Sequence, residues 1–214
     1  EIYGLTKGQY SPTSKLGKVT KTSPYGTVER PFNPGELVIG ARGTFFARSI
    51  DAEVNLTTDC MVAASKHDGL SVIEVLVNCM IFNNGTHKAF AGDKEVRAEH
   101  TITLRHGEKM LFGKNMDKGL MLDNMKLKVV TVGENGVTLD DILVHDAHEK
   151  DTMVHVMLAS MKYPDYPVAL GVIRDVEAPT YEHEVARQIA EVQATAKIKN
   201  VDDLLNSGET WEVE

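Results

Sequence analysis

Apolar and polar residues along the first half of the chain follow helical and strand-like spacing in turn. The Asn33-Pro34 pair can begin a short helix over 35–41, and the run 44–48 is rich in residues that favour strands. A second helix over Leu56–Lys66 and a nearly continuous apolar strand over Leu70–Val77 repeat this order. Apolar strands that alternate with helices predict an α/β fold whose mainly parallel sheet is flanked by helices on both faces.

The pattern changes beyond residue 95. Between Val96 and Val137, alternating runs such as Thr101–Leu104 and Leu127–Val132 are separated by turns that contain glycine. This spacing predicts a β-rich insertion of hairpin strands outside the main sheet.

The last third of the chain contains one more apolar segment at Met153–Ser160 and one more strand at Val168–Arg174. A helix over 180–196 and an acidic extension over 201–214 then form a C-terminal helical tail. We therefore expect three parts, which are residues 1–95, 96–137 and 138–214.

A glycine-punctuated segment opens the chain, where Ile2-Tyr3 is interpreted as the end of a buried strand. Gly4 and Gly8 permit positive φ and the close approach of a ligand, Thr6 offers a hydroxyl, and Lys7 offers a compact cation. These groups suit a phosphate or a carboxylate, although the same residue types also form ordinary surface turns. The following residues, up to Pro34, lack apolar periodicity and predict a long loop, a kind of segment that is usually functional.

Composition narrows the classes of partner. The chain has 214 residues, 42% of them hydrophobic, which is enough to bury a core. Its net charge of -8 argues against a general nucleic-acid binder, and no apolar run approaches the roughly 20 residues of a membrane span. Small molecules and protein partners remain.

Only two cysteines occur, Cys60 and Cys79, and they form no CxxC pair. This excludes a disulfide framework and a self-contained zinc site, and it fits a reducing cytoplasm. The run His145–Glu149 carries metal-capable side chains, but no distant residue completes a site, so we expect a charged connector there. Without further information, Cys79 after an apolar strand is interpreted as a buried small residue.

Several short motifs occur in a characteristic order along the chain. They are Tyr3–Gln9, Ser11–Thr13, Asn33-Pro34, Gly43–Arg48, Val75–Cys79, Phe82-Asn83 and Pro179–Glu182. With these motifs, the chain resembles the β subunits of the 2-oxoacid:ferredoxin oxidoreductases over most of its length. The Gly-Leu-Thr-Lys-Gly-Gln form is most similar to the two-subunit type that includes 2-oxoglutarate:ferredoxin oxidoreductase. Since the chain opens on Glu1 rather than Met, we expect it to be the C-terminal part of a longer subunit.

The resemblance implies a thiamine diphosphate-binding fold and a set of site residues. Thiamine diphosphate is held through Mg²⁺, whose ligands would be an upstream aspartate, an asparagine immediately before Glu1, and the backbone carbonyl of Ile2. By the same resemblance, the segment Gly4, Leu5, Thr6 would meet the diphosphate, and Lys7 would orient the 2-oxoacid carboxylate. Cys79 would complete a 4Fe-4S cluster whose other three ligands lie nearer the N-terminus of the subunit, and Cys60 would be a core residue.

The resemblance also implies an activity. It is the coenzyme A-dependent oxidative decarboxylation of 2-oxoglutarate to succinyl-CoA and CO₂, reversible, with electrons passing through the cluster to ferredoxin. A separate α subunit would complete the active site. Three alternatives stay open: a pyruvate or broad-specificity enzyme, a thiamine-dependent enzyme without a cluster, and a non-catalytic assembly subunit.

Overall fold

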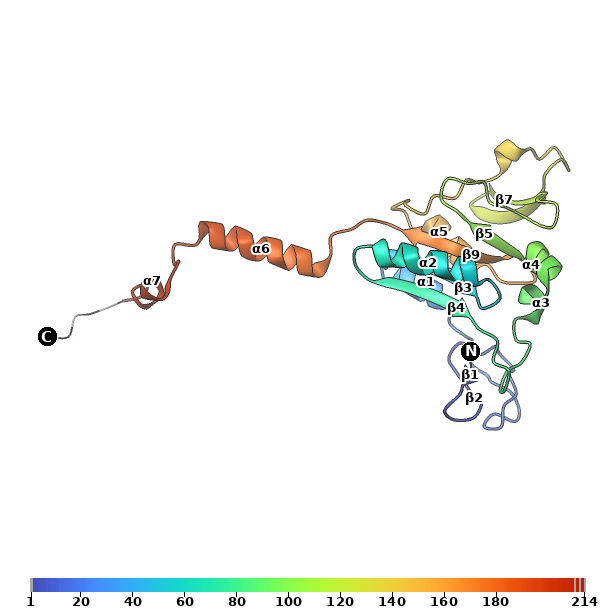
Figure 1. Cartoon of the computed structure of the whole chain (residues 1–214), viewed down its shortest axis with the longest axis horizontal. Helices are drawn as coiled ribbons and strands as arrows, with labels where there is room; N and C mark the ends of the chain where they lie inside the picture. The colour runs from blue at the N-terminus through green and yellow to red at the C-terminus, as the bar shows by residue number, and fades with distance from the viewer. Residues whose placement is uncertain (1, 210, 212, 214) are drawn as a thin grey trace. The chain divides into compact units, whose positions relative to one another are not determined.

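A computed structural model describes residues 2–209, 211 and 213 of the chain. It divides into two compact units, Glu1–Glu177 and Ala178–Glu214 (Figure 1). Among the described residues, the first unit holds three sheets, the core and the candidate site residues. The second holds the helices α6 and α7 in its described part.

A four-stranded mixed sheet forms the centre of the first unit. Its strands lie in the order β4 (Ser71–Leu76), β3 (Phe45–Ile50), β9 (Val168–Asp175) and β5 (Thr101–Leu104). The pairs β4–β3 and β9–β5 are parallel, but the central pair β3–β9 is antiparallel. The expected sheet was mainly parallel, and the alternation of helices and strands could not reveal that β9 runs in the opposite direction.

Strand β5 corrects one prediction. The run Thr101–Leu104 was expected among hairpin strands outside the main sheet, but it pairs with β9 at the sheet edge, and Ile102 and Leu104 are buried there. Its alternating pattern is typical of any half-buried strand and does not indicate which strand it pairs with. The division of the chain at residues 95 and 137 stays a prediction.

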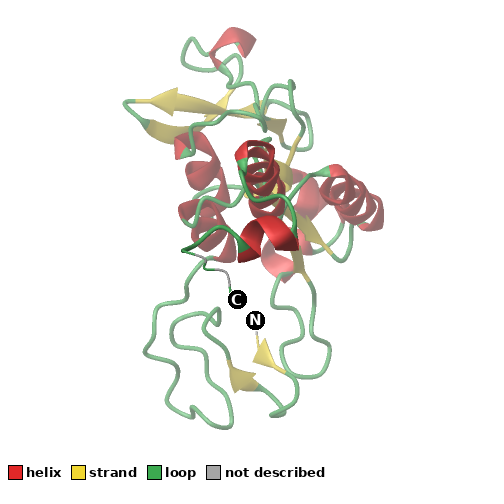
Figure 2. Ribbon diagram, turned by 90° about the vertical axis from the view of Figure 1, so that its left-hand side faces the viewer, coloured by secondary structure: helices red, strands yellow, loops and turns green. Residues whose placement is uncertain are grey.

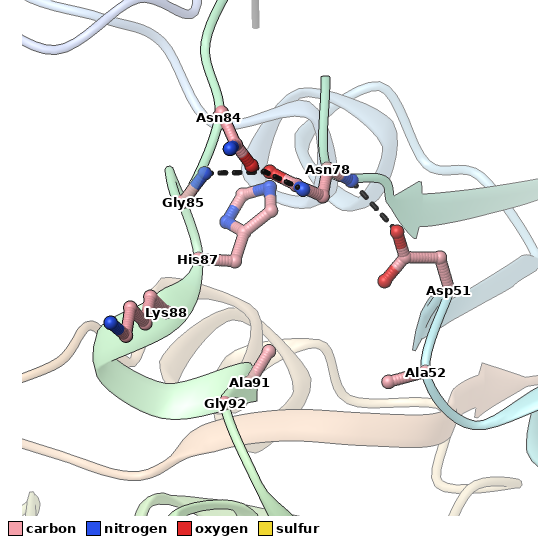
Figure 3. A pocket seen from close by; sticks show the side chains of 9 residues that line it. All are labelled: Asp51, Ala52, Asn78, Asn84, Gly85, His87, Lys88, Ala91 and Gly92. Carbon is pink, nitrogen blue, oxygen red and sulfur yellow. Dashed lines mark hydrogen bonds between the residues drawn. The ribbon is translucent and has the colours of Figure 1, made fainter. Parts of the chain in front are cut away.

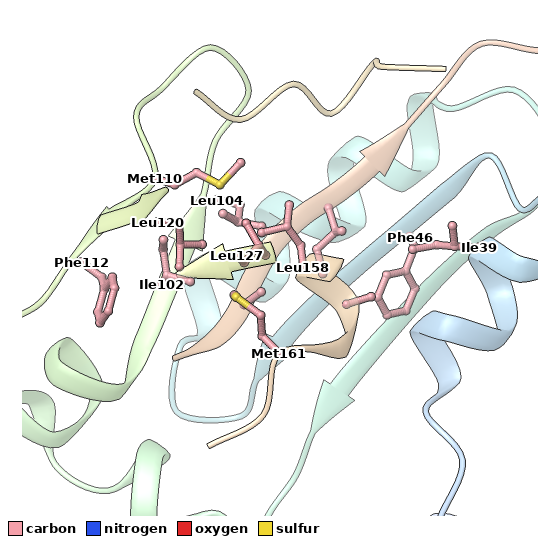
Figure 4. Close-up of a cluster of buried hydrophobic side chains, with 13 residues drawn as sticks. Ile39, Phe46, Ile102, Leu104, Met110, Phe112, Leu120, Leu127, Leu158 and Met161 are labelled. Carbon is pink, nitrogen blue, oxygen red and sulfur yellow. The ribbon is translucent and has the colours of Figure 1, made fainter. Parts of the chain in front are cut away.

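Helices cover both faces of the central sheet. On one face, Phe45 and Ala47 of β3 pack against Cys60 of α2 (Val54–Lys66). On the other face, Phe46 packs in the main core with residues of α1 (Pro34–Gly40) and α5 (Met153–Ser160), as Figure 4 shows for Ile39 and Leu158. Because successive side chains of β3 point to opposite faces of the sheet, this strand packs against both helical layers.

The start of α1 follows from its sequence. The side chain of Asn33 accepts a hydrogen bond from Gly35 N at 2.9 Å, and Pro34 occupies the first turn, where a missing N–H costs nothing. A Cβ on Gly35 would lie only 2.6 Å from the Phe46 ring, so this glycine allows the helix to approach the sheet. The expected helix is confirmed to within two residues.

A small antiparallel sheet lies beside the central one. Its strands are β6 (Leu111–Phe112), β7 (Lys118–Asp123) and β8 (Lys126–Thr131), and its buried residues Leu120 and Leu127 join the main core. The sequence pattern predicted hairpin strands here. It did not predict the two short helices that precede this region, α3 (Lys88–Ala91) and α4 (Lys94–His100). A 3₁₀ helix with a capping box follows the small sheet at Leu139–Asp141.

The first thirty residues form a loop region at the opposite end of the first unit from the small sheet (Figures 1 and 2). Strands β1 (Ile2–Tyr3) and β2 (Gln9–Tyr10) pair only with each other. The prediction that Ile2-Tyr3 ends a buried strand was therefore wrong, since Tyr3 is 48% exposed. The following loop is ordered by its own hydrogen bonds, including Thr27 N to the Lys18 carbonyl at 3.1 Å.

The second unit contains α6 (Tyr181–Thr195) and α7 (Val201–Leu205), whose capping residues are Thr180 and Asn200. Residues 210, 212 and 214 of the expected acidic extension lie outside the described residues. In the described part of the chain, no helix has the length and apolarity needed to cross a membrane.

Two histidines lie inside the core of the first unit. The ring of His155 accepts a hydrogen bond from Arg174 Nη1 at 2.8 Å through Nδ1, and its Nε2 donates to the Asp146 carbonyl at 2.8 Å. The Nε2 of His145 donates to the Val172 carbonyl at 2.8 Å. The hydrogen bond from Arg174 requires a neutral ring at His155, and burial is the main cause that lowers the pKa of His145 and of His155, which favours the neutral form of both rings.

We expect these histidines to make the fold sensitive to mild acid. In the unfolded chain they take up protons near pH 6.5, whereas the folded chain resists protonation, so the free energy of unfolding falls as pH drops through that value. Urea midpoints at about pH 7.5 and about pH 5.5 measure this loss. The variant His155→Gln should lose less stability between the two pH values, and an unchanged difference would contradict the assignment.

Candidate functional site

The turn between β1 and β2 has a strained backbone. Lys7 N donates to the Gly4 carbonyl at 3.0 Å, and Gly8 N donates to the Tyr3 carbonyl at 2.9 Å. Positive φ occurs at Lys7 (59°) and Gly8 (100°). A positive φ was expected at Gly4 as well, but Gly4 has none, because Lys7 adopts the left-handed conformation in this turn. A lysine in this conformation carries a cost, which marks Lys7 as a functional candidate.

The top of this turn is open to solvent. Leu5 is 97% exposed, and Thr6 and Lys7 are exposed as well, whereas Ile2 is half-buried in β1. The amides of Lys7 and Gly8 are used inside the turn, whereas the N–H groups of Gly4, Leu5 and Thr6 make no turn or loop hydrogen bond to the described part of the chain. The turn can therefore offer backbone donors, a hydroxyl and a cation to an anion.

Cys79 lies three residues beyond the end of β4 and is partly exposed. The amide of Phe82 points to its sulfur at 3.4 Å. The backbone N–H of Phe82 is the main cause that lowers the pKa of Cys79, and the N–H groups of Ile81 and Asn83 act in the same direction. Because Cys79 is partly exposed, it is not a fully buried core residue. Backbone donors around a cysteine sulfur favour the thiolate, which is the form of cysteine that binds metal.

The fold brings the turn and the Cys79 loop together. A Cβ on Gly8 would lie 3.3 Å from Cδ1 of Phe82, so the glycine is in contact with the ring that follows Cys79. Lys18 Nζ donates to Asn83 Oδ1 at 2.5 Å, and Asn83 N donates to the Cys79 carbonyl at 3.0 Å. Two segments about seventy residues apart in the sequence thus form one site.

A cleft of about 520 Å³ opens beside this site, at the carboxyl ends of β3 and β4 (Figure 3). Asp51 accepts a hydrogen bond from Asn78 N at 2.8 Å. The side chain of Asn78 accepts a hydrogen bond from Gly85 N at 2.8 Å through Oδ1 and donates one to Asn84 Oδ1 at 2.9 Å through Nδ2. His87 also lines the cleft, and burial lowers its pKa. Open sheets bind ligands at the carboxyl ends of parallel strands. We did not predict this cleft, although Asp51 and Asn78 directly follow strands.

Cys60 is a core residue. It is buried in α2, and burial raises its pKa to about 11, so it is an inert thiol. Among the described residues, no group of three or more His, Cys, Asp or Glu side chains is arranged to hold a metal ion.

Known proteins are similar in sequence to this chain, although no family model matches it. The 2-oxoglutarate oxidoreductase subunit KorB of Mycobacterium tuberculosis is 37% identical over all of this chain and 57% of its own length. The 2-oxoglutarate synthase subunit KorB of Archaeoglobus fulgidus is 42% identical over 36% of this chain and 29% of its own length. The chain thus spans little more than half of the curated relative that it matches throughout.

A solved structure shares the fold. The 2-oxoglutarate:ferredoxin oxidoreductase from Magnetococcus marinus, with 2-oxoglutarate, coenzyme A and succinyl-CoA bound, aligns with 98% of this chain and 55% of the solved chain. The TM-score is 0.61 at 20% identity, which supports a common fold and no finer detail. By its sequence, the chain is similar over all of its length to a 2-oxoglutarate oxidoreductase subunit KorB and over about a third of its length to a 2-oxoglutarate synthase subunit KorB.

Proposed function

We propose that the chain is the part of a 2-oxoacid:ferredoxin oxidoreductase β subunit that joins a thiamine diphosphate site to an iron-sulfur cluster. The reaction would be the coenzyme A-dependent oxidative decarboxylation of 2-oxoglutarate to succinyl-CoA and CO₂, with ferredoxin as electron acceptor. The observation that carries this proposal is the contact between the Gly4–Gly8 turn and the Cys79 loop. A diphosphate-binding turn beside a thiolate is what such an electron path requires.

The turn fits a diphosphate group. The N–H groups of Gly4, Leu5 and Thr6 and the Thr6 hydroxyl would donate to its oxygens, and the carbonyl of Ile2 would be a ligand of Mg²⁺. The aspartate and asparagine ligands implied by the resemblance are absent from these 214 residues, so they would come from a preceding segment. Bound thiamine diphosphate supplies an electron sink for the loss of CO₂.

Lys7 would position the substrate. Its ammonium group belongs to an exposed turn, and its left-handed backbone fixes the direction in which the side chain leaves the turn. A carboxylate bound there would gain a charge-assisted hydrogen bond. This contact would align the keto carbon with the cofactor, because the two binding groups are adjacent in the same turn.

Cys79 would hold one iron of a 4Fe-4S cluster. The three backbone N–H groups that stabilise its thiolate also tune the reduction potential of a cluster in such a position. Since Cys60 is buried in α2, the other three thiolates would lie outside these residues. The α subunit would complete the substrate pocket, and a heterodimer or a pair of heterodimers would be the working unit.

The complete enzyme with its α subunit provides the test. We expect 2-oxoglutarate and coenzyme A together to support reduction of a viologen dye and formation of succinyl-CoA, with pyruvate much less effective. Equal rates with pyruvate would reassign the substrate. Failure of both 2-oxoacids, with thiamine diphosphate and cluster present, would favour the non-catalytic assembly subunit and contradict the proposal.

A further inference from the structure

The helices of the second unit, Ala178–Glu214, leave their apolar side chains uncovered. We name this unit the C-terminal arm. In its described part, neither α6 nor α7 contains a buried residue, and Leu204, Leu205 and Trp211 are 59%, 69% and 83% exposed. A helix of about 15 residues is marginal in water, and most helical stability in proteins comes from packing an apolar face. The arm therefore needs a surface that covers it.

Large apolar side chains form one stripe along α6. They recur at intervals of four, four and three residues, which places them on the same face of the helix. The members of this apolar stripe are Tyr181, Val185, Ile189 and Val192. Ile189 and Val192 are 51% and 61% exposed. On another face, Arg187 pairs with Glu184 and Glu191, each at 2.6 Å. The helix is thus amphipathic, and its apolar face is the one that a partner can cover.

The arm is also strongly acidic. Its sequence holds eight carboxylates and three cations, which is a net charge of -5, whereas the much longer first unit has a net charge of -3. Like charges oppose contact between the arm and a first unit, whether that unit belongs to the same copy or to a second copy. A surface that complements the arm is apolar where it meets the stripe and basic around it. We therefore look for the partner in a different polypeptide.

We propose that the C-terminal arm docks on the α subunit, in a groove with an apolar floor and a basic rim. This inference rests on the proposed function, which supplies the α subunit. The apolar stripe would fill the groove as amphipathic helices do in other complexes, and the carboxylates of the arm would pair with the rim. Since the candidate site residues lie in the first unit, the arm would act in assembly and not in the chemistry.

The test measures the Kd between the complete β subunit and the α subunit. The double variant Ile189→Glu/Val192→Glu places two charges in the apolar stripe and should raise the Kd roughly 100-fold or more. The control Ala190→Glu/Ala194→Glu adds two carboxylates at exposed positions on the opposite face of α6 and should leave the Kd almost unchanged. Added salt should raise the Kd of the unmodified pair, because it screens the rim. Cluster absorption and bound thiamine diphosphate should not change in either variant.

A Kd that the stripe variant leaves unchanged, or that the control raises equally, would overturn the inference. A Kd that does not respond to salt would overturn the basic rim. Self-association of the β subunit alone that only the stripe variant abolishes would assign the arm to a second copy and also overturn the inference. The proposed function fails in a different way: the unmodified subunits would bind each other with the predicted response to the variants, yet reduce no viologen dye with either 2-oxoacid.

Discussion

Replacing Cys79 with alanine in the complete enzyme should remove most of the visible absorption of the iron-sulfur cluster and abolish the reduction of ferredoxin. The backbone N–H of Phe82 points to the sulfur of Cys79 and lowers the pKa of this thiol, which favours the thiolate that binds iron. Alanine would leave one iron without a ligand. Iron content and the absorption spectrum of the purified complex measure the loss. The fold should persist, because Cys79 is partly exposed and its loop does not enter the core.

Cys60→Ala is the matched control for this change. It removes the other cysteine of the chain, which packs between α2 and the sheet, and it should lower stability by about 1–2 kcal/mol without changing the iron content. If Cys79→Ala retained both the cluster and ferredoxin reduction, Cys79 would not be a ligand. The proposed electron path would then be wrong.

Replacing Lys7 with alanine should lower kcat/KM for 2-oxoglutarate by roughly 10- to 100-fold. The reason is the loss of a charge-assisted hydrogen bond to the substrate carboxylate, which contributes about 1.5–3 kcal/mol. Cluster absorption and thiamine diphosphate content should not change. Steady-state kinetics with a viologen acceptor measure the effect on substrate without involving the docking of ferredoxin.

The backbone of Lys7 offers an internal control. Its φ of 59° is unfavourable for lysine and alanine alike, whereas glycine adopts it freely. Lys7→Gly should therefore stabilise the turn slightly and still lose as much activity as Lys7→Ala. If Lys7→Gly kept full activity, the ammonium group would have no role in the reaction, and Lys7 would be an ordinary turn residue.

Helix α1 and strands β3 and β4 were predictable because the capping and apolar patterns in their sequences agree with the tertiary contacts that they make. Asn33-Pro34 starts α1, and the apolar runs of β3 and β4 have helical layers to pack against. The direction of β9 and the pairing of β5 were not predictable, since pairing is set by segments far apart in the sequence. Helix α4 was missed because its polar sequence lacks an apolar face.

The candidate site was also predictable only in part. The residue types in the first turn pointed to Lys7, and the resemblance supplied its role and that of Cys79; both roles remain predictions. No local pattern could place Phe82 against Gly8, or Lys18 against Asn83, because these contacts depend on how two loops lie on the folded sheet. The cleft beside Asp51 likewise exists only because β3 and β4 end side by side.

The central claim is that electrons from a 2-oxoacid enter a cluster held by Cys79. The most direct measurement is the visible absorption of the complete enzyme under anaerobic conditions, with coenzyme A present and ferredoxin absent. Addition of 2-oxoglutarate should bleach the cluster band in the unmodified enzyme, and pyruvate should bleach it much less. A filled cluster whose absorption stays unchanged after 2-oxoglutarate is added would contradict the account.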